Sequence, residues 1–310
     1  MQILQDNNLG NHLTLKAIGR SMTIDYLPNS GKFDNIMITL VDCNGNEEAK
    51  QVFPCNQPAR CFFNVETSGE YSLHIFAGPT TDCLYHSLYG GVNGIPMLFN
   101  GKNFTFKASP FTLANARFVN ELPISADFLS KCLGPTFEIQ CDIFAIRSLA
   151  SEIKRGRIFP ESIMIGVNDW VAKNISYDLD SLVGKRYLNC DNSAAAVLQT
   201  RRGVCCGYHN LTSALLRACG IPTLGIVCFS LGRHSNGWWY DRDNMIQETN
   251  HIMTAAFVSK RWRLMDVTWN SDNEYRQGRV VSRSGLGATR TYCDATIPFI
   301  SLSHRFDDYE

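Results

Sequence analysis

The chain has 310 residues, of which 45% are hydrophobic and 19% are charged, and its formal net charge at pH 7 is zero. This length gives room for a large core and favours two domains over one. A neutral chain has no overall attraction to nucleic acid or anionic lipid, so we expect no nucleic-acid partner and no membrane binding. No apolar run approaches the roughly 20 residues that a membrane-spanning helix needs.

The chain contains twelve cysteines, and no two of them have CxxC spacing. In a small secreted protein an even number of cysteines suggests a disulfide framework, but most of these lie in apolar runs such as GIVCF. We therefore interpret them as buried thiols of a reducing compartment, and we expect no structural zinc site. The start MQILQDNNLGNHLTLK has neither a basic nor an apolar segment of a secretory signal. A cytoplasmic location is the expectation, unless an upstream signal has been removed.

Short strand patterns fill residues 1–108. Examples are HLTLKAIG, NIMITLVDC, ARCFFNVET and EYSLHIFAG, separated by turn clusters such as PNSGK and ETSGE. Few helical patterns intervene, so we predict an antiparallel β-sandwich. This region shows no motif that combines histidine, cysteine and carboxylate, which favours a packing or targeting module over catalysis.

A different pattern follows a connector at residues 109–135. IFAIRSLASEI and PESIMIGVNDWVAKNI are helical in pattern, and Pro160 suits the first turn of the second helix. SAAAVLQT is also helical, and the strands LGIVCFS, HIMTAAFV and RWRLMDVTW come later. The link Ser259-Lys260 predicts a hairpin between the last two strands. Residues 136–310 are therefore expected to form an α+β domain with an antiparallel sheet.

The stretch GVCCGYHNLTSALLRACGIP, residues 203–222, begins with two adjacent cysteines, Cys205 and Cys206. Free backbone N–H groups and the positive dipole end at a helix start favour an anion, lower the pKa of a thiol and can bind an oxyanion. A buried cysteine of purely structural role would look similar. Gly203, just before the helix, has no side chain to keep a substrate backbone away.

A helical wheel separates the two cysteines. The expected apolar face consists of Tyr208, Leu211, Leu215, Ala218 and Cys219. Cys205 lies at the edge of that face, where the helix is expected to meet the strands. Cys206 lies on the other side with Asn210, Ser213 and Arg217, so it faces away from that contact. The wheel therefore favours Cys205 as the nucleophile.

A thiol nucleophile needs a base, and the base needs an orienting group. His251 opens one strand of the predicted hairpin, and Asp266 lies near the end of the other. The two side chains are expected at the same open end of adjacent strands, within reach of each other. Alone, each has an ordinary interpretation, a packing histidine and a turn-forming aspartate. The pairing is the informative feature.

From about residue 160 to 305 the chain resembles the transglutaminase-like superfamily. The resemblance is carried by VNDWVAKNISYD, RRGVCCGYHNLTSALLRACGIP and NHIMTAAFVSKRWRLMDVTW, and faintly by FISLSHRFDDY. It implies a papain-like core with Cys205 as nucleophile, His251 as its base and Asp266 as the residue that orients the base. Met253 stands where relatives often carry an aromatic residue, which bears on substrate contacts.

The resemblance implies acyl transfer through a thioester on Cys205, with no metal or organic cofactor. We expect a cysteine protease or amidase that hydrolyses a bond in a peptide or protein substrate. The alternatives are a transglutaminase that crosslinks proteins through an amine acceptor, and a binding module without catalysis. No acidic loop has the spacing of an EF-hand calcium site.

The polar stretch LGRHSNGWWYDRDNMIQETN, just before His251, holds Trp238 and Trp239. As a loop beside the site, it is a candidate for substrate binding through these tryptophans or for a lid. The alternative is that the tryptophans pack the loop onto the protein. The sequence sets no oligomeric state.

Overall fold

A computed structural model describes residues 1–6, 13–26, 35–54, 59–78, 86–87, 94–183, 190–231, 248–271, 273–282 and 288–310. The chain divides into two compact units. The first holds the described residues within Met1–Ala116, Ser230–Gln247 and Ala295–Arg305. The second holds those within Arg117–Phe229, Glu248–Asp294 and Phe306–Glu310. The boundaries expected from sequence, at residues 108 and 135, stay predictions.

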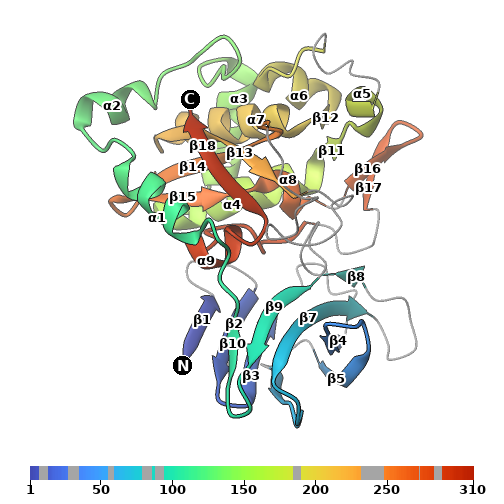
Figure 1. Ribbon diagram of the computed structural model, residues 1–310. Helices are drawn as coiled ribbons and strands as arrows, with labels where there is room; N and C mark the ends of the chain where they lie inside the picture. Colours follow the sequence, from blue (N-terminus) through green and yellow to red (C-terminus); the bar gives the residue numbers. More distant parts are fainter. Residues whose placement is uncertain are drawn as a thin grey trace. The chain divides into compact units, whose positions relative to one another are not determined.

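The first unit is rich in sheet, as expected (Figure 1, blue to teal). Its strands are β1 (Gln2–Gln5), β2 (Leu13–Ile18), β3 (Ser21–Tyr26), β4 (Asn35–Asp42), β5 (Glu47–Pro54), β6 (Ala59–Phe62), β7 (Gly69–Gly78), β8 (His86–Ser87), β9 (Ile95–Phe99) and β10 (Phe104–Phe106). One sheet has the order β1-β2-β3-β6, and the other has the order β10-β9-β7-β4-β5, with β8 paired to β7. All the pairings are antiparallel.

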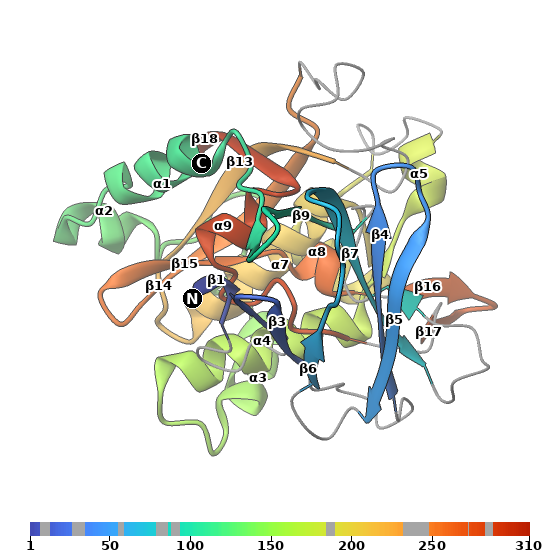
Figure 2. The same ribbon diagram turned by 60° about the horizontal axis from the view of Figure 1, so that its bottom comes forward.

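Alternation along these strands builds the core of the first unit. In β4, Ile36, Ile38 and Leu40 are fully buried, because side chains two positions apart share one face of a sheet. Figure 2 shows β4 and β5 side by side, in the antiparallel register that pairs Ile38 with Gln51. The expectation that the two sheets pack face to face as a sandwich stays a prediction.

The second unit is a mixture of helices and sheet. Its helices include α2 (Ala126–Lys131), α3 (Phe144–Lys154), α4 (Pro160–Asn174), α5 (Leu179–Val183), α6 (Ala194–Thr200), α7 (Cys205–Ala218) and α8 (Val267–Asn270). Its main sheet is β13 (Thr223–Ser230), β14 (His251–Val258), β15 (Arg261–Met265) and β18 (His304–Tyr309), in the order β15-β14-β13-β18. Short pairs are formed by β11 (Ser176–Tyr177) with β12 (Arg202–Gly203) and by β16 (Asn273–Arg276) with β17 (Arg279–Ser282). Of the remaining helices, α9 (Ile297–Ile300) falls in the first unit, and α1 (Thr112–Glu121) is divided between the two units after Ala116.

Three helices of the second unit lie where the sequence predicts them. Helix α4 begins at Pro160, whose missing N–H costs nothing in a first turn. Helix α6 begins after Ser193, whose hydroxyl accepts a hydrogen bond from the N–H of Ala196. Helix α3 lies next to α4 (Figure 2), and both contact α7.

The side of α7 opposite its apolar face is also buried. Ser213 is fully buried and Arg217 is 8% exposed. The reason is that α7 packs against α3, α4 and α6 as well as against β14 (Figure 1). Polar groups on this helix find internal partners: Arg217 donates to the hydroxyl and carbonyl of Thr223 and to the carbonyl of Gly134. Buried polar groups with such partners avoid most of the cost of desolvation.

The predicted hairpin between β14 and β15 is confirmed. Val258 pairs with Arg261, so the two linking residues are Ser259 and Lys260. Both have positive φ, 52° and 64°, as a type I′ turn requires. This register fixes which end of β14 lies beside the end of β15.

None of the helices in the described ranges is long and apolar enough to cross a membrane. The ten cysteines that lie in those ranges are all free thiols, and six of them are buried. The expected cytoplasmic location stays a prediction.

Candidate active site

Cys205 is the first residue of α7. The residue before it, Val204, has no side-chain hydrogen bond that caps the helix, so the backbone N–H groups of the first turn have no capping acceptor in that residue. The Cys205 sulfur accepts hydrogen bonds from the N–H of Cys206, in the same turn, and from the N–H of Ile252 on β14. The partly buried thiol therefore lies between the positive end of a helix and the edge of the sheet.

His251 opens β14 and is buried. Its Nε2 lies 2.7 Å from Oδ2 of Asp266, and its ring also forms a hydrogen bond with the Cys205 sulfur. The structure thus brings together the three residues that the sequence singled out. Sulfur, imidazole and carboxylate follow one another in the order that thiol activation needs.

Asp266 is fully buried and holds its position through three groups. It is the N-cap of α8, because Oδ1 accepts a hydrogen bond from the N–H of Trp269 at 3.0 Å. Its own N–H donates to the carbonyl of Tyr292. The other carboxylate oxygen remains for His251, so the helix cap orients the carboxylate that orients the imidazole.

The turn that carries Asp266 is fixed by a buried network of polar groups. Asn270 donates to Oδ1 of Asn168 at 2.7 Å and accepts from the N–H of Tyr292 at 2.8 Å. Asn168 in turn donates to the carbonyl of Thr289. These bonds link α4 to α8 and to residues 289–292, and they hold the turn that carries Asp266 in place.

The surroundings shift the pKa values of Cys205 and His251 in opposite directions. Burial raises the pKa of Cys205, but the hydrogen bond and charge of His251, with the two backbone N–H groups, outweigh it and lower the value overall. Burial lowers the pKa of His251, yet the charge and hydrogen bond of Asp266, with the Cys205 sulfur, raise it to about 10. Between these two pKa values the site holds a thiolate beside an imidazolium.

The neighbouring thiols are in a different state. Burial and the nearby Cys205 raise the pKa of Cys206 to about 11. Cys228, opposite His251 in the β13–β14 register, is buried, and its pKa is also raised, first by burial. Near neutral pH both are therefore thiols, and the thiolate is the reactive form. The structure thus distinguishes Cys205 from Cys206 by electrostatics as well as by position.

His209 lies one turn along α7 from Cys205, but it is a packing residue. Its Nδ1 lies 2.9 Å from the hydroxyl of Thr254. Burial, followed by the charge of Arg217, lowers the pKa of His209 to about 3. A histidine that stays neutral and is bonded to a hydroxyl does not supply the ion pair found at His251.

The sequence did not single out Tyr177 as a site residue. Tyr177 pairs with Gly203 in the parallel β11–β12 ladder, two positions before Cys205, and its ring centroid lies 6.3 Å from that of Tyr208. Burial, and next the charge of Cys205, raise the pKa of its hydroxyl. The signal available in the sequence was the position of Tyr177 in the block VNDWVAKNISYD. Only the pairing of β11 with β12 brings this residue near Cys205.

Two expectations from the sequence remain, one for Gly203 and one for the two tryptophans. A Cβ on Gly203 would lie 3.2 Å from Val197 Cγ2, so the missing side chain serves packing against α6. Trp238 and Trp239 lie outside the described residues, and their part in substrate binding stays a prediction.

Comparison with known proteins agrees with this geometry. The family profile described as the transglutaminase-like superfamily matches residues 147–267. That segment is a transglutaminase-like domain. The match includes Cys205, His251 and Asp266, and it confirms the resemblance seen in the sequence.

Two curated relatives of the transglutaminase-like domain are the kyphoscoliosis peptidases of Mus musculus and Homo sapiens. Each is 27% identical over 106 residues, which is 33% of this chain and 14% of the relative. The chain therefore matches only a small part of the length of these curated relatives.

Two solved structures show some similarity. A proposed cysteine protease from Cytophaga hutchinsonii has a TM-score of 0.36 and 12% identity, covering 94% of this chain and 86% of its own. A proposed protease from Parabacteroides distasonis has a TM-score of 0.30 and 13% identity, covering 80% of this chain and 40% of its own.

Proposed function

We propose that the transglutaminase-like domain is a thiol-dependent acyl-transfer enzyme that hydrolyses a peptide or related amide bond. The single observation that supports this most is the hydrogen-bonded series from Cys205 through His251 to Asp266 at the start of α7. The pKa shifts of Cys205 and His251 favour a thiolate–imidazolium pair, which is the reactive state of a cysteine nucleophile.

In the first half of the proposed reaction, the Cys205 sulfur attacks the carbonyl carbon of the substrate amide. The carbonyl oxygen becomes an oxyanion, and a backbone N–H of the first turn of α7 is its proposed donor. When the C–N bond breaks, the departing nitrogen takes the proton of the His251 imidazolium. The products are a free amine and a thioester on Cys205.

In the second half, neutral His251 accepts a proton from water, and the resulting hydroxide attacks the thioester. The C–S bond breaks, the acid leaves, and the thiolate and imidazolium are restored. The sum is amide plus water to acid plus amine. Asp266 keeps the Nε2 side of the ring occupied, so that the other ring nitrogen serves the sulfur in both halves.

The first test is chemical labelling of the native protein. We expect iodoacetamide at pH 6 to modify Cys205 before any other cysteine, as mapped by mass spectrometry, and we expect His251→Ala to remove this preference. Slow and uniform labelling of several thiols would instead support a binding module without catalysis.

A second test separates hydrolysis from crosslinking. The protein is incubated with a glutamine-rich protein and a labelled primary amine, and Cys205→Ala serves as the control. We expect peptide-bond or amide hydrolysis without incorporation of the amine. Incorporation that depends on Cys205 would identify a transglutaminase, in which the amine replaces water in the second half of the reaction.

A further inference from the structure

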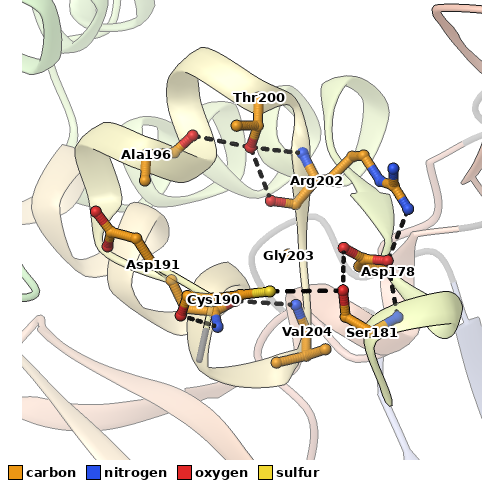
Figure 3. Close-up of a pocket in the computed structure, with 10 residues that line it drawn as sticks. Asp178, Ser181, Cys190, Asp191, Ala196, Thr200, Arg202, Gly203 and Val204 are labelled. Carbon is orange, nitrogen blue, oxygen red and sulfur yellow. Dashed lines mark hydrogen bonds and ion pairs between the residues drawn. The ribbon is translucent and has the colours of Figure 1, made fainter. Parts of the chain in front are cut away.

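A pocket of about 320 Å³ lies in the second unit immediately before Cys205 in the chain (Figure 3). Its walls come from Asp178 and α5, from the segment before α6 and α6 itself, and from β12 with the following Val204. Gly203 and Val204 form part of the wall, and Val204 is directly bonded to Cys205. The N–H of Val204 is 3.4 Å from Oδ1 of Asn192, another wall residue, so the wall is tied to the approach to α7.

The pocket is close enough to the sulfur to receive a substrate side chain. Consecutive Cα atoms are about 3.8 Å apart, and an extended peptide advances by about 3.3 Å per residue. Gly203 and Val204 therefore lie within one or two substrate residues of a carbonyl that reaches Cys205. A side chain flanking the attacked bond is the part of a peptide substrate with the length to enter this pocket.

The charged groups on the walls decide which side chain fits. Arg202 is the one cation among the described wall residues, and it is already neutralised: its Nη2 lies 2.7 Å from Oδ1 of Asp178 and 3.5 Å from Oδ2 of Asp180. Its guanidinium also lies over the ring of Tyr275. The Nε of Arg202 is buried without a hydrogen-bond partner in the described ranges, which leaves a donor for a carbonyl but no uncompensated positive charge.

Asp191 supplies a negative charge that the described cations do not balance. Its Oδ1 accepts a hydrogen bond from the N–H of Ser193, a neutral donor. Figure 3 shows Asp191 and Asp178 on opposite sides of the segment 202–204. An acidic substrate side chain would meet this uncompensated carboxylate and find Arg202 engaged, whereas a cationic side chain would be attracted.

We propose that this pocket binds a basic side chain, lysine or arginine, in the substrate residue next to the carbonyl that Cys205 attacks. The inference rests on the proposed acyl-transfer function and adds the substrate class. Asp191 is the residue that selects for charge, and Asp178 acts mainly by keeping Arg202 neutralised.

The test uses chloromethyl ketones that alkylate a reactive cysteine and carry lysine, norleucine or glutamate next to the reactive group. Lysine and norleucine differ chiefly in the terminal ammonium group, so the ratio of their rates of Cys205 labelling measures the charge preference. We expect lysine to label roughly two- to fivefold faster than norleucine, as for an ion pair with the exposed Asp191. The glutamate reagent should be the slowest, and added salt should lower the ratio.

Asp191→Asn keeps the hydrogen bond to Ser193 and removes the charge, so the lysine-to-norleucine ratio should fall towards one. Asp127→Asn removes an exposed carboxylate from α2 and should leave the ratio unchanged. Iodoacetamide, which has no side chain, should label Cys205 at the same rate in all three proteins.

Equal rates for lysine and norleucine, a faster reaction of the glutamate reagent, or a ratio that survives Asp191→Asn would overturn the inference while leaving the proposed function in place. If iodoacetamide fails to label Cys205 in preference to the other thiols, the proposed function fails, and the inference that rests on it fails as well. The two failures are therefore distinguishable.

Discussion

His251 and Asp266 are joined by a hydrogen bond of 2.7 Å between Nε2 and Oδ2, although 15 positions separate them in the chain. The carboxylate has two partners at once, because its other oxygen caps α8 through the N–H of Trp269. One buried side chain thus fixes both a helix start and an imidazole ring. Substitutions of Asp266 can separate these two roles.

Asp266→Asn is expected to keep the cap and to lose the charge, since asparagine caps helices about as well as aspartate. Without the charge of Asp266, the pKa of His251 should fall from its raised value, and the ion pair with Cys205 should weaken. We expect the rate of amide hydrolysis to fall by roughly a hundredfold or more. The measurement is the initial rate on a peptide substrate, with the pKa of His251 followed by NMR.

Asp266→Ala serves as the matched comparison, because it removes the cap as well as the charge. It should lower the free energy of unfolding by about 1 kcal/mol more than Asp266→Asn does. Equal stabilities of the two variants in urea unfolding would show that the bond to Trp269 does not hold α8.

The pH dependence of Cys205 labelling should reveal the pairing with His251. In the wild type the thiol pKa is lowered, so labelling by iodoacetamide should persist at pH values below those of an ordinary cysteine. In His251→Gln the profile should move upward, because the hydrogen bond and charge that favour the thiolate are lost. A profile that does not move would mean that the helix start alone activates the sulfur.

The same pair makes a prediction for folding stability. The pKa of His251 is raised to about 10 from its ordinary value of 6.5, so its contribution to stability is fully present below 6.5 and is lost as the pH rises through 10. The lowered pKa of Cys205 acts the other way, since its contribution to stability is present above the ordinary value of 9.0 and is lost as the pH falls through the pKa in the folded protein. Above 6.5, and between the lowered pKa of Cys205 and 9.0, the two proton exchanges largely cancel.

Cys205→Ala removes the thiol whose loss of a proton on folding compensates for the proton gained by His251. Its free energy of unfolding should therefore decrease as the pH rises above 6.5, by up to about 1.4 kcal/mol per pH unit. Urea unfolding at several pH values measures this slope. The double variant Cys205→Ala with His251→Gln should lose it, and a slope that remains would place its origin in another group.

Gly207, in the first turn of α7, has no room for a side chain. A Cβ there would lie 2.9 Å from Val197 Cγ2 and 3.0 Å from Oδ1 of Asn192. Gly207→Ala should push α6 away from α7 and reduce stability by about 1–3 kcal/mol. Val197→Ala in the same chain should relieve part of the clash, so the double variant should be more stable than the sum of the single effects predicts.

A substitution of Lys260 should increase the free energy of unfolding. Its φ of 64° lies in the left-handed region, which costs a residue with a side chain about 1–2 kcal/mol. Lys260→Gly should relieve that strain, against the larger entropy of glycine in the unfolded chain, and raise stability by about 0.5–1 kcal/mol. The neighbouring Ser259 is left intact because its hydroxyl contacts Glu161. Thermal unfolding checks the sign, and the labelling rate of Cys205 should stay constant.

Much of the site could be predicted from local patterns. The link Ser259-Lys260 predicted the hairpin between β14 and β15. The register of that hairpin predicted that the strand ends carrying His251 and Asp266 are neighbours. The helical pattern that begins at the two cysteines, just after Gly203 and Val204, predicted that the helix starts at Cys205. These features depend on turn chemistry and on periods of a few residues, which the sequence displays directly.

The face of α7 could not be predicted in the same way. Ser213 and Arg217 lie opposite the apolar face on the helical wheel, and both are buried because other helices cover that side. Nor does a helical wheel show that the N–H of Ile252, on a strand more than 40 positions later, reaches the Cys205 sulfur. Such contacts arise from the packing of distant segments.

The sequence by itself predicted that Cys205, His251 and Asp266 would lie together, because their positions at a helix start and at two strand ends follow from short-range patterns. Only the tertiary structure decided their ionisation and the composition of the adjoining pocket. The physical reason is that a pKa and a binding preference depend on burial and on charges within a few ångströms, and Asp178, Asp191 and Arg202 become neighbours only when the chain folds.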